Sequence, residues 1–300
     1  LTAVDKFILI GDYKQLPAVV QQSEKDSAIP TIDDRQDHAV IDMSILQDIC
    51  LSNCRNSLFE RLIRWEGHEK RSDFIGILRR QGRMHPEIAE FPNQMFYRRE
   101  QLEPVPCPHQ LETELAYTLP SQDALDDVLK AHRMIFIPSQ FCKEPNVSDK
   151  INASEASIVV DVLRRVHRFY GKDFNAQKTV GVIVPYRNQI AMIRREIEQM
   201  GIEPLTRISI DTVERYQGSQ RDVIIYSFTI QHAYQLDFLT ANCMEEDGQV
   251  IDRKLNVALT RARKQLIITG HEPTLRQNAL FAKLLDHIRS REGYAEPQKE

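Results

Sequence analysis

The chain has 300 residues, enough for two domains of ordinary size. Hydrophobic residues make up 42% and charged residues 27%, which is typical of a globular protein and excludes a fibrous or wholly disordered chain. The formal net charge is −4, which argues against binding of nucleic acid through bulk positive charge, so any nucleic-acid groove must be a local arrangement.

The sequence holds no membrane segment that we can recognise. No apolar run approaches the roughly 20 residues of a membrane helix. The first residues, LTAVDKFILIGDY, do not resemble a signal peptide because an aspartate interrupts their apolar stretch. We therefore expect a soluble protein with no membrane partner, cytoplasmic or, in a eukaryote, nuclear.

The five cysteines form an odd and scattered set. An iron–sulfur or zinc site needs four ligands brought together, and no CxxC pair is present. We therefore expect no metal site, and reduced, buried thiols at Cys50, Cys54, Cys107, Cys142 and Cys243.

From residue 130 onward the pattern predicts an α/β fold. Short β-branched runs alternate with helix-length segments, which is typical of buried parallel strands in βαβ units. The predicted strands are Met134–Pro138, Val180–Val184, Arg207–Val213, Val223–Thr229 and Leu266–Gly270. The predicted helices are Ser154–Tyr170, Gln189–Met200, a stretch ending at Arg263, and Thr274–Arg289. For the first helix we expect the N-cap in SEAS (154–157) and an end at Gly171.

The first third of the chain has a different pattern. Lys6–Ile10 predicts one strand, and no second strand of similar quality follows before Met134. Residues 21–56 are acidic and polar, and the proline-rich residues 101–128 indicate a connecting loop or insertion. Because a lone parallel strand needs neighbours, we expect the chain to begin inside a domain.

The first informative segment is GDYKQLP (11–17), directly after the opening strand. Ligands of open α/β sheets bind outside the carboxyl ends of strands, where Asp12 and Gln15 would lie. The alternative is a strand followed by an ordinary Gly-Asp turn.

The second segment is QGRMHP (81–86), followed by FPN (91–93) and FY (96–97). Arg83 precedes a helix that Pro86 could open, so it is placed to reach an anion. The alternative makes Arg83 a surface cation and His85 a helix cap.

The third and fourth segments are TVERYQGSQRD (212–222), between two apolar strands, and LNVALTRAR (255–263). The fourth predicts a helix packed on the sheet, with Arg261 and Arg263 on different faces. One of the two arginines could then point into a cleft while the other is a solvated surface charge.

These four segments, with VIVPYR (182–187) between the second and third, strongly resemble superfamily 1 helicases. The branch most similar is the 5′→3′ group of the nonsense-mediated-decay RNA helicase and senataxin, and SLFERL (57–62) also resembles it. The resemblance runs from about Lys6 to Gly270. It implies a RecA-like P-loop NTPase fold, with a parallel sheet flanked by helices. By this resemblance residues 1–80 are the C-terminal remnant of a first RecA-like domain and 81–300 are the second, with a boundary near Ile77–Gln81.

The resemblance also implies roles for individual residues. Gln15 would sense the γ-phosphate of ATP and its attacking water, and Arg83 and Arg261 would reach across the cleft to the γ-phosphate. Such an arginine is worth about 10³–10⁵ in rate, because phosphoryl transfer spreads negative charge over the γ-oxygens. Further nucleotide-binding residues would be Asp12, Gln81, Gln217, Gly218 and Gln220.

Three residues resemble family positions along the nucleic-acid strand: Pro185, Tyr186 and Thr212. A hydroxyl can hold a phosphate, and an aromatic face can stack a base without reading its sequence. The expected partner is single-stranded DNA or RNA. The alternative for Tyr186 is an aromatic residue of an interface core.

The chain departs from the family pattern at two positions. Gly82 stands where the family usually has an aromatic ring that stacks on adenine, and Gln220 stands where it usually has glutamate. These departures imply a looser nucleotide site, or a residue supplied from elsewhere.

The phosphate cradle is missing from the printed sequence. No stretch fits GxxxxGK[ST], since Gly171-Lys172 is followed by Asp173, and the acidic Mg²⁺-binding motif is also missing. We therefore expect the chain alone to hold neither ATP nor Mg²⁺ and not to hydrolyse ATP. Both would be cofactors of a full-length protein whose N-terminal helicase half is a further partner.

The function we expect is that of the C-terminal part of an ATP-dependent helicase or translocase, contributing arginine fingers and part of the single-strand groove. Closure on ATP and opening after hydrolysis would move the domains along the strand. One alternative is a degenerate RecA-like module that binds nucleic acid or a protein partner without ATP turnover. Another makes Asp12 a Mg²⁺ ligand of a different NTPase.

Overall fold

The computed structural model describes residues 5–17, 25–29, 43–51, 53–68, 73–142 and 148–295. The chain divides into two compact units, residues 1–78 and residues 79–300. Each unit is described by itself.

In its described residues the first unit has the helices α1 (Met43–Asp48) and α2 (Leu58–His68). The predicted strand Lys6–Ile10 is wrong: these residues have no regular secondary structure, and Ile8 and Ile10 are 89% and 84% exposed. A parallel strand is held by hydrogen bonds to its neighbours, and the described part of this unit contains no strand to pair with it. Much of the acidic segment 21–56 lies outside the described residues.

The second unit is an α/β domain. Its strands are β1 (Arg80–Gln81), β2 (Glu103–Pro104), β3 (Met134–Pro138), β4 (Val180–Val184), β5 (Ser209–Thr212), β6 (Arg221–Ser227), β7 (Cys243–Glu246), β8 (Gln249–Asp252) and β9 (Ala262–Gly270). Its longer helices are α3 (Pro86–Met95), α4 (Ala124–Ala131), α5 (Ala153–Tyr170), α6 (Arg187–Met200), α10 (Arg253–Leu259) and α12 (Ala279–Ser290). Short helical turns are η1 (Pro108–Gln110), η2 (Gly171–Asp173), α7 (Glu203–Thr206), α8 (Val213–Tyr216), η3 (Ala233–Gln235), α9 (Leu236–Leu239) and α11 (Glu272–Leu275).

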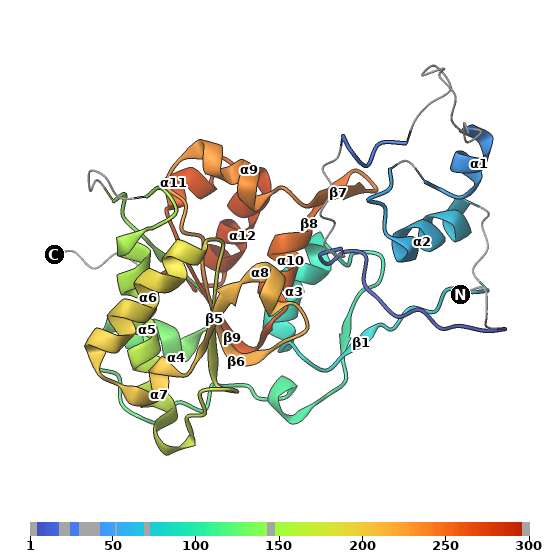
Figure 1. Ribbon diagram of the computed structural model, residues 1–300. Helices are drawn as coiled ribbons and strands as arrows, with labels where there is room; N and C mark the ends of the chain where they lie inside the picture. The colour runs from blue at the N-terminus through green and yellow to red at the C-terminus, as the bar shows by residue number, and fades with distance from the viewer. Residues whose placement is uncertain are drawn as a thin grey trace. The chain divides into compact units, whose positions relative to one another are not determined.

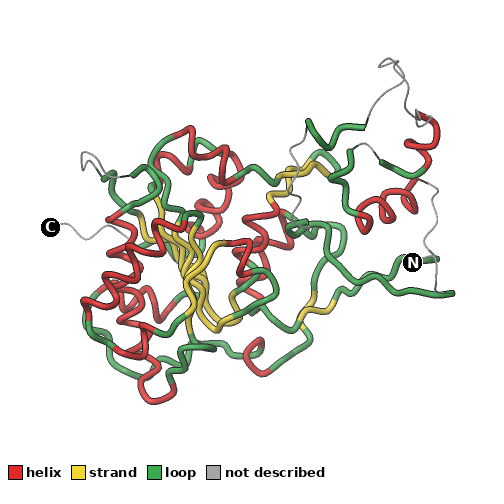
Figure 2. The backbone as a smooth tube through the Cα atoms, in the orientation of Figure 1, coloured by secondary structure: helices red, strands yellow, loops and turns green. Residues whose placement is uncertain are grey.

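The main sheet has five parallel strands in the order β3-β9-β6-β4-β5. Figure 1 shows α5, α6 and α7 on one side of it and α3, α8 and α10 on the other. Figure 2 shows the strands running together between these helices. The second unit therefore has the three-layer architecture of a RecA-like fold, as the sequence predicted.

The core follows from alternation along the strands. On one face Ile135, Val182 and Ile225 are completely buried against apolar residues of α5 and α6. On the other face Phe228, just after β6, packs against Phe281 of α12 with ring centroids 5.1 Å apart. Because both faces are covered, the strands are continuous apolar runs, and this made them predictable.

A close approach to β4 requires a glycine. A Cβ atom at Gly181 would lie 1.8 Å from the hydroxyl oxygen of Tyr216, which follows β5 in the short helix α8. Tyr216 is 1% exposed, and its hydroxyl donates to the Ser209 carbonyl at 3.3 Å. The missing side chain at 181 therefore lets Tyr216 lie across the strands.

Three predicted boundaries are corrected. Helix α5 is capped by Asn152, whose side chain accepts from the Glu155 N–H at 3.0 Å, and not from within SEAS. The closing helix is two helices, because Asn278 caps a new start at α12. The fourth segment's helix ends at Leu259, so Arg261 lies in a turn and Arg263 in β9. The prediction that the two arginines lie on different faces of one helix is therefore wrong.

The cysteines are free, as expected, but none of them is buried. Cys54 and Cys243 are exposed, and Cys50, Cys107 and Cys142 are half-buried. Within the described ranges, no helix is both long enough and apolar enough to cross a membrane.

Candidate functional site

The turn between β1 and α3 carries Arg83. The Gln81 side-chain oxygen accepts from the N–H groups of Arg83 at 2.9 Å and Met84 at 2.7 Å, and its Nε2 donates to the Met84 carbonyl at 2.8 Å. The amide of Gln81 is therefore used to shape this turn.

His85 is the cap of α3, and Pro86 is the first residue of the helix. His85 Nδ1 accepts from the Glu87 N–H at 3.3 Å, and Nε2 lies 2.9 Å from the Glu112 carbonyl oxygen. Burial, followed by the nearby Arg133 charge, lowers the pKa of His85 below its usual value. These contacts confirm the cap interpretation, and they fix the direction in which the chain leaves Arg83.

Arg83 joins residues from three of the four informative segments. Its Nε donates to Gln220 Oε1 at 3.1 Å, and its Nη1 donates to the Thr260 carbonyl at 3.3 Å. Burial lowers the pKa of Arg83 from its usual value, but a guanidinium remains protonated in proteins. Arg83 is thus a held cation with defined neighbours, which argues against the plain surface-cation alternative.

Gln220 and Arg261 lie side by side at the amino ends of β6 and β9 because of the register of these two strands. Arg221 of β6 pairs with Ala262 of β9, so the residues just before them stand side by side. The Arg221 N–H donates to the Arg261 carbonyl at 3.2 Å. The amino ends of β6 and β9 therefore bring the third and fourth segments together beside Arg83.

Arg261 itself is 1% exposed. Its Nε donates to the Val257 carbonyl and its Nη2 to the Thr260 hydroxyl oxygen, both at 3.0 Å. Arg263 is no freely solvated charge, because its Nη1 donates to Asp222 Oδ1 at 2.7 Å. The expectation that one of these two arginines is a solvated surface charge is wrong.

Gln217 and Gly218 lie in the turn from α8 to β6. Gly218 has a φ of +84°, a conformation that favours glycine. The Ser219 N–H donates to the Tyr216 carbonyl at 3.0 Å and closes the turn. Gln217, Gly218 and Gln220 are all exposed, so their polar groups are accessible to a ligand.

The side chains of Cys107 and Val105 lie close to Gly82. A Cβ atom there would lie 3.3 Å from Cys107 Sγ and 3.7 Å from Val105. A larger residue at 82 would have to be directed away from these two side chains. In this chain no aromatic ring extends from position 82.

Asp12 and Gln15, in the first unit, form a local turn. Gln15 Nε2 donates to Asp12 Oδ2 at 2.7 Å, and the Lys14 N–H donates to Asp12 Oδ1 at 3.0 Å. The two predicted residues are therefore in direct contact, in a turn that no strand precedes.

The residues predicted to bind the nucleic-acid strand lie at the other end of the main sheet, where its strands have their carboxyl ends. Val184 of β4 pairs with Thr212 of β5, so Pro185, Tyr186 and Thr212 stand at the carboxyl ends of neighbouring strands. Tyr186 is 9% exposed, and its ring stacks on Phe238 with centroids 5.0 Å apart. Phe238 is 44% exposed, so it is the accessible ring of the pair.

The structure shows no metal-ligand cluster at the predicted site residues that it describes, and the pocket it forms along α3 is lined by other residues. Among the residues that the structure describes, no cluster of three or more His, Cys, Asp or Glu could hold a metal ion. A pocket of about 460 Å³ lies along α3, and none of its lining residues belongs to the predicted site. Among the described residues, the predicted site around Arg83 is therefore an arrangement of arginine and amide groups.

The family follows from comparison with known proteins. A family model described as an AAA domain (AAA_12) matches residues 54–273. The chain belongs to this AAA domain family. Together with the named relatives below, this places it among superfamily 1 helicases of the nonsense-mediated-decay and senataxin type.

Three relatives are similar to almost the whole chain. An uncharacterized ATP-dependent helicase of Methanocaldococcus jannaschii is 27% identical over 95% of this chain and 35% of its own length. Helicase sen1 of Schizosaccharomyces pombe is 28% identical over 97% of this chain and 14% of its own length. Regulator of nonsense transcripts 1 of Dictyostelium discoideum is 30% identical over 95% and 18%. The chain thus spans about a third or less of the relatives that it matches.

Sequence reasoning missed the residues that support the site. Asn256 Nδ2 donates to the Tyr97 hydroxyl oxygen at 2.9 Å and ties α10 to the segment after α3. His109 and Gln110 of η1 bind the turn that carries Arg83. Asn256 and Tyr97 belong to recognised segments, but nothing local in residues 101–128 signals the role of η1.

Proposed function

We propose that the chain is the C-terminal part of an ATP-dependent helicase or translocase that acts on single-stranded DNA or RNA. In this proposal residues 1–80 end a first RecA-like domain, and residues 81–300 form the second. The observation that carries it is the position of Arg83, a cation held where three motif segments meet. The chain's family membership and the names of its relatives support ATP-dependent helicase activity as the reaction class.

The nucleotide requires residues that this chain does not have. Neither a P-loop in the printed sequence nor a metal-ligand cluster among the described residues is present. We propose on this ground that the chain alone does not hold Mg²⁺–ATP. We propose that a preceding part of the same protein holds it, in line with the small share of each relative that the chain spans.

The contribution of this chain would be positive charge at the γ-phosphate. Arg83 is half-buried, and its neighbours Gln220 and the Thr260 carbonyl are uncharged. No carboxylate in the described structure neutralises it through a direct ion pair, so its charge remains available to a phosphate. A guanidinium placed there would stabilise the charge of the transition state.

The nucleic acid would lie at the end of the sheet where the strands have their carboxyl ends. The carboxyl ends of β4 and β5 present Pro185, Tyr186 and Thr212 together. The Thr212 hydroxyl would contact a phosphate, and Phe238, which is 44% exposed and stacks on Tyr186, would contact a base. In the proposal the exposed Phe238 makes the stacking contact, while Tyr186 supports it.

The test is ATP hydrolysis by the full-length protein with and without single-stranded nucleic acid. Arg83→Ala is expected to lower kcat by about 10³-fold or more. Arg195→Ala is the matched control, because Arg195 is an exposed arginine of α6 and should leave kcat unchanged. Unchanged kcat in the Arg83 variant would refute the proposal.

A second candidate is a module that binds nucleic acid without ATP turnover. It is favoured by Gly82, where no ring extends toward a base, and by the neutral Gln220. It predicts that the wild-type full-length protein binds single strands but releases no phosphate above background.

A further inference from the structure

The short helix η1 clamps the turn that carries Arg83. Gln110 Nε2 donates to the carbonyl oxygens of Gln81 and Met84, both at 2.9 Å. His109 Nε2 lies 2.8 Å from the carbonyl oxygen of Arg83. Three carbonyls of this turn, those of Gln81, Arg83 and Met84, are thus bound by two neighbouring side chains from outside the motif segments.

Within η1, Gln110 is itself held in place. Its side-chain oxygen accepts from the Cys107 N–H at 3.0 Å, and the residue is only 4% exposed. His109 is 5% exposed. Both side chains therefore occupy fixed, desolvated positions against the turn, and they do not reach it from flexible surface conformations.

The second nitrogen of His109 faces another motif. Arg263 Nη2 lies 3.3 Å from His109 Nδ1, and Arg263 Nη1 donates to Asp222 Oδ1 at 2.7 Å. The imidazole therefore continues a line of hydrogen bonds that runs from Asp222 through Arg263 to the backbone of Arg83. This line connects the segments 212–222, 255–263 and 81–86.

The partners of His109 select one tautomer of its neutral imidazole. A guanidinium can only donate, so Nδ1 must accept from Arg263. A carbonyl can only accept, so Nε2 must carry the proton that is donated to Arg83. Both bonds form only in the neutral Nε2–H tautomer.

We propose that His109 is a positioning residue for Arg83, and that it sets the arginine by tying its backbone carbonyl to the Arg263–Asp222 pair. The inference rests on the proposed function, because it assigns His109 a role in placing the arginine that would reach the γ-phosphate. His109 contacts the backbone of Arg83 and the side chain of Arg263, and it makes no direct contact with the reacting groups.

The tautomer can be tested on this chain without any turnover. Nitrogen-15 spectra of the imidazole, assigned by comparison with His109→Gln, should show a protonated Nε2 and an unprotonated Nδ1 at neutral pH. A protonated Nδ1 would overturn the inference, because Arg263 would then have no acceptor at that atom.

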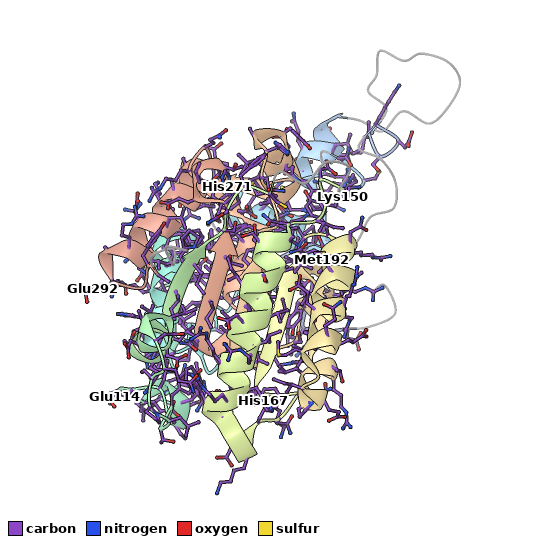
Figure 3. The ribbon with its side chains drawn as sticks, turned by 90° about the vertical axis from the view of Figure 1, so that its left-hand side faces the viewer. Glu114, Lys150, His167, Met192, His271 and Glu292 are labelled. Atoms are coloured by element: carbon purple, nitrogen blue, oxygen red, sulfur yellow. The ribbon has the colours of Figure 1, made fainter. Side chains whose placement is uncertain are left out.

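The positioning role is tested by kinetics of the full-length protein. His109→Leu removes both bonds and is expected to lower kcat by about 10- to 100-fold, with little change in KM for ATP. His109→Gln should recover most of kcat, since its Nε2 can still donate to the Arg83 carbonyl. His167→Leu is the control, because His167 lies on α5 (Figure 3) and its ring packs on Phe174 with centroids 4.8 Å apart.

A double substitution separates positioning from a general effect on folding. If His109 acts through Arg83, His109→Leu costs nothing further in an Arg83→Ala background. An equal loss in both backgrounds, or wild-type kcat in the single variant, would overturn the inference while leaving the proposed function standing. Unchanged kcat in Arg83→Ala alone would instead refute the proposed function, and the role of His109 with it.

Discussion

Arg83 and Gln220 lie 137 positions apart in the sequence, yet the guanidinium Nε donates to the side-chain oxygen of Gln220 at 3.1 Å. The contact is between a full charge and a neutral amide. It orients the guanidinium without neutralising it, which is what the proposed phosphate contact requires. Gln220 is also one of the two positions at which this chain departs from the family pattern.

Replacing Gln220 with glutamate would convert this contact into an ion pair. Because Gln220 is exposed, we expect Gln220→Glu to raise the free energy of unfolding by no more than about 1 kcal/mol at low salt. The gain should shrink at high salt, since exposed ion pairs are screened. Urea unfolding at two salt concentrations measures it, with Gln140→Glu as the control that adds a charge at an exposed position after β3. A salt-independent effect would contradict the predicted pairing.

Arg261 combines a proposed catalytic role with complete burial. Arg261→Ala in the full-length protein should abolish strand-stimulated ATP hydrolysis while nucleotide binding stays nearly intact. It should also lower the free energy of unfolding by on the order of 3 kcal/mol, because it removes a buried side chain bonded to Val257 and Thr260. Phosphate release is therefore measured at a temperature where circular dichroism shows the variant folded. Retained turnover under those conditions would remove Arg261 from the site.

Glu155 is a buried carboxyl that the proposed mechanism does not use. It accepts from the Ser227 hydroxyl at 2.6 Å and the Thr229 N–H at 2.7 Å, and it is completely buried. Burial outweighs these hydrogen bonds and raises the pKa of Glu155 to about 8. The side chain is therefore mostly protonated at neutral pH and titrates only above it.

The sign of the resulting pH dependence is fixed. The pKa is higher in the folded state than in the unfolded state, so ionisation of Glu155 opposes folding. The free energy of unfolding therefore falls as pH rises toward 8, because the folded state must give up a proton that it holds more tightly than the unfolded state does. Well above pH 8 this loss is constant. The slope is at most about 1.4 kcal/mol per pH unit.

The substitution Glu155→Gln should remove this slope. Unfolding titrations in urea between pH 6 and 9 measure it. Glu203→Gln, at a carboxyl that is 63% exposed in α7, serves as the control that keeps the wild-type slope. An unaltered slope in Glu155→Gln would show that Glu155 is ionised throughout.

Gly181→Ala tests the packing of Tyr216 across β4. The new methyl carbon would lie 1.8 Å from the Tyr216 hydroxyl oxygen and 2.9 Å from the carbon that bears it, so the ring must move. We expect a loss of about 1–3 kcal/mol in the free energy of unfolding. Gly76→Ala, where nothing lies within 4 Å of the added carbon, should change it by less than about 0.5 kcal/mol. Equal stability of the two variants would contradict the packing described.

The main sheet was predictable because its strands are local apolar runs. Met134–Pro138 and Val180–Val184 are confirmed residue for residue, since both are bounded by turn residues and buried on both faces. The same reasoning failed for Lys6–Ile10, which is equally apolar but has no partner strand among the described residues of its unit. An apolar run shows that a segment can be a strand, and only a neighbouring strand makes it one.

The candidate site was predictable as a set of motifs but not as a set of contacts. Three of the four segments identified Arg83, Gln220 and Arg261, and the register of β6 and β9 brings Gln220 and Arg261 together. The His109 contacts join residues 26 and 154 positions apart, and no local pattern encodes such a pair. The hairpin of β7 and β8 was also missed, although its Asp247-Gly248 turn is a recognised hairpin signal.

The central claim is that this chain contributes arginines to an ATPase whose phosphate cradle lies elsewhere in the protein. The most direct test measures phosphate release by residues 1–300 alone, with and without single-stranded DNA or RNA, beside the full-length protein and its Arg83→Ala variant. We predict no turnover from residues 1–300, strand-stimulated turnover from the full-length protein, and its loss in the variant. Turnover by residues 1–300 that depends on Arg83 would contradict the account, because the chain would then build a complete phosphate site of its own.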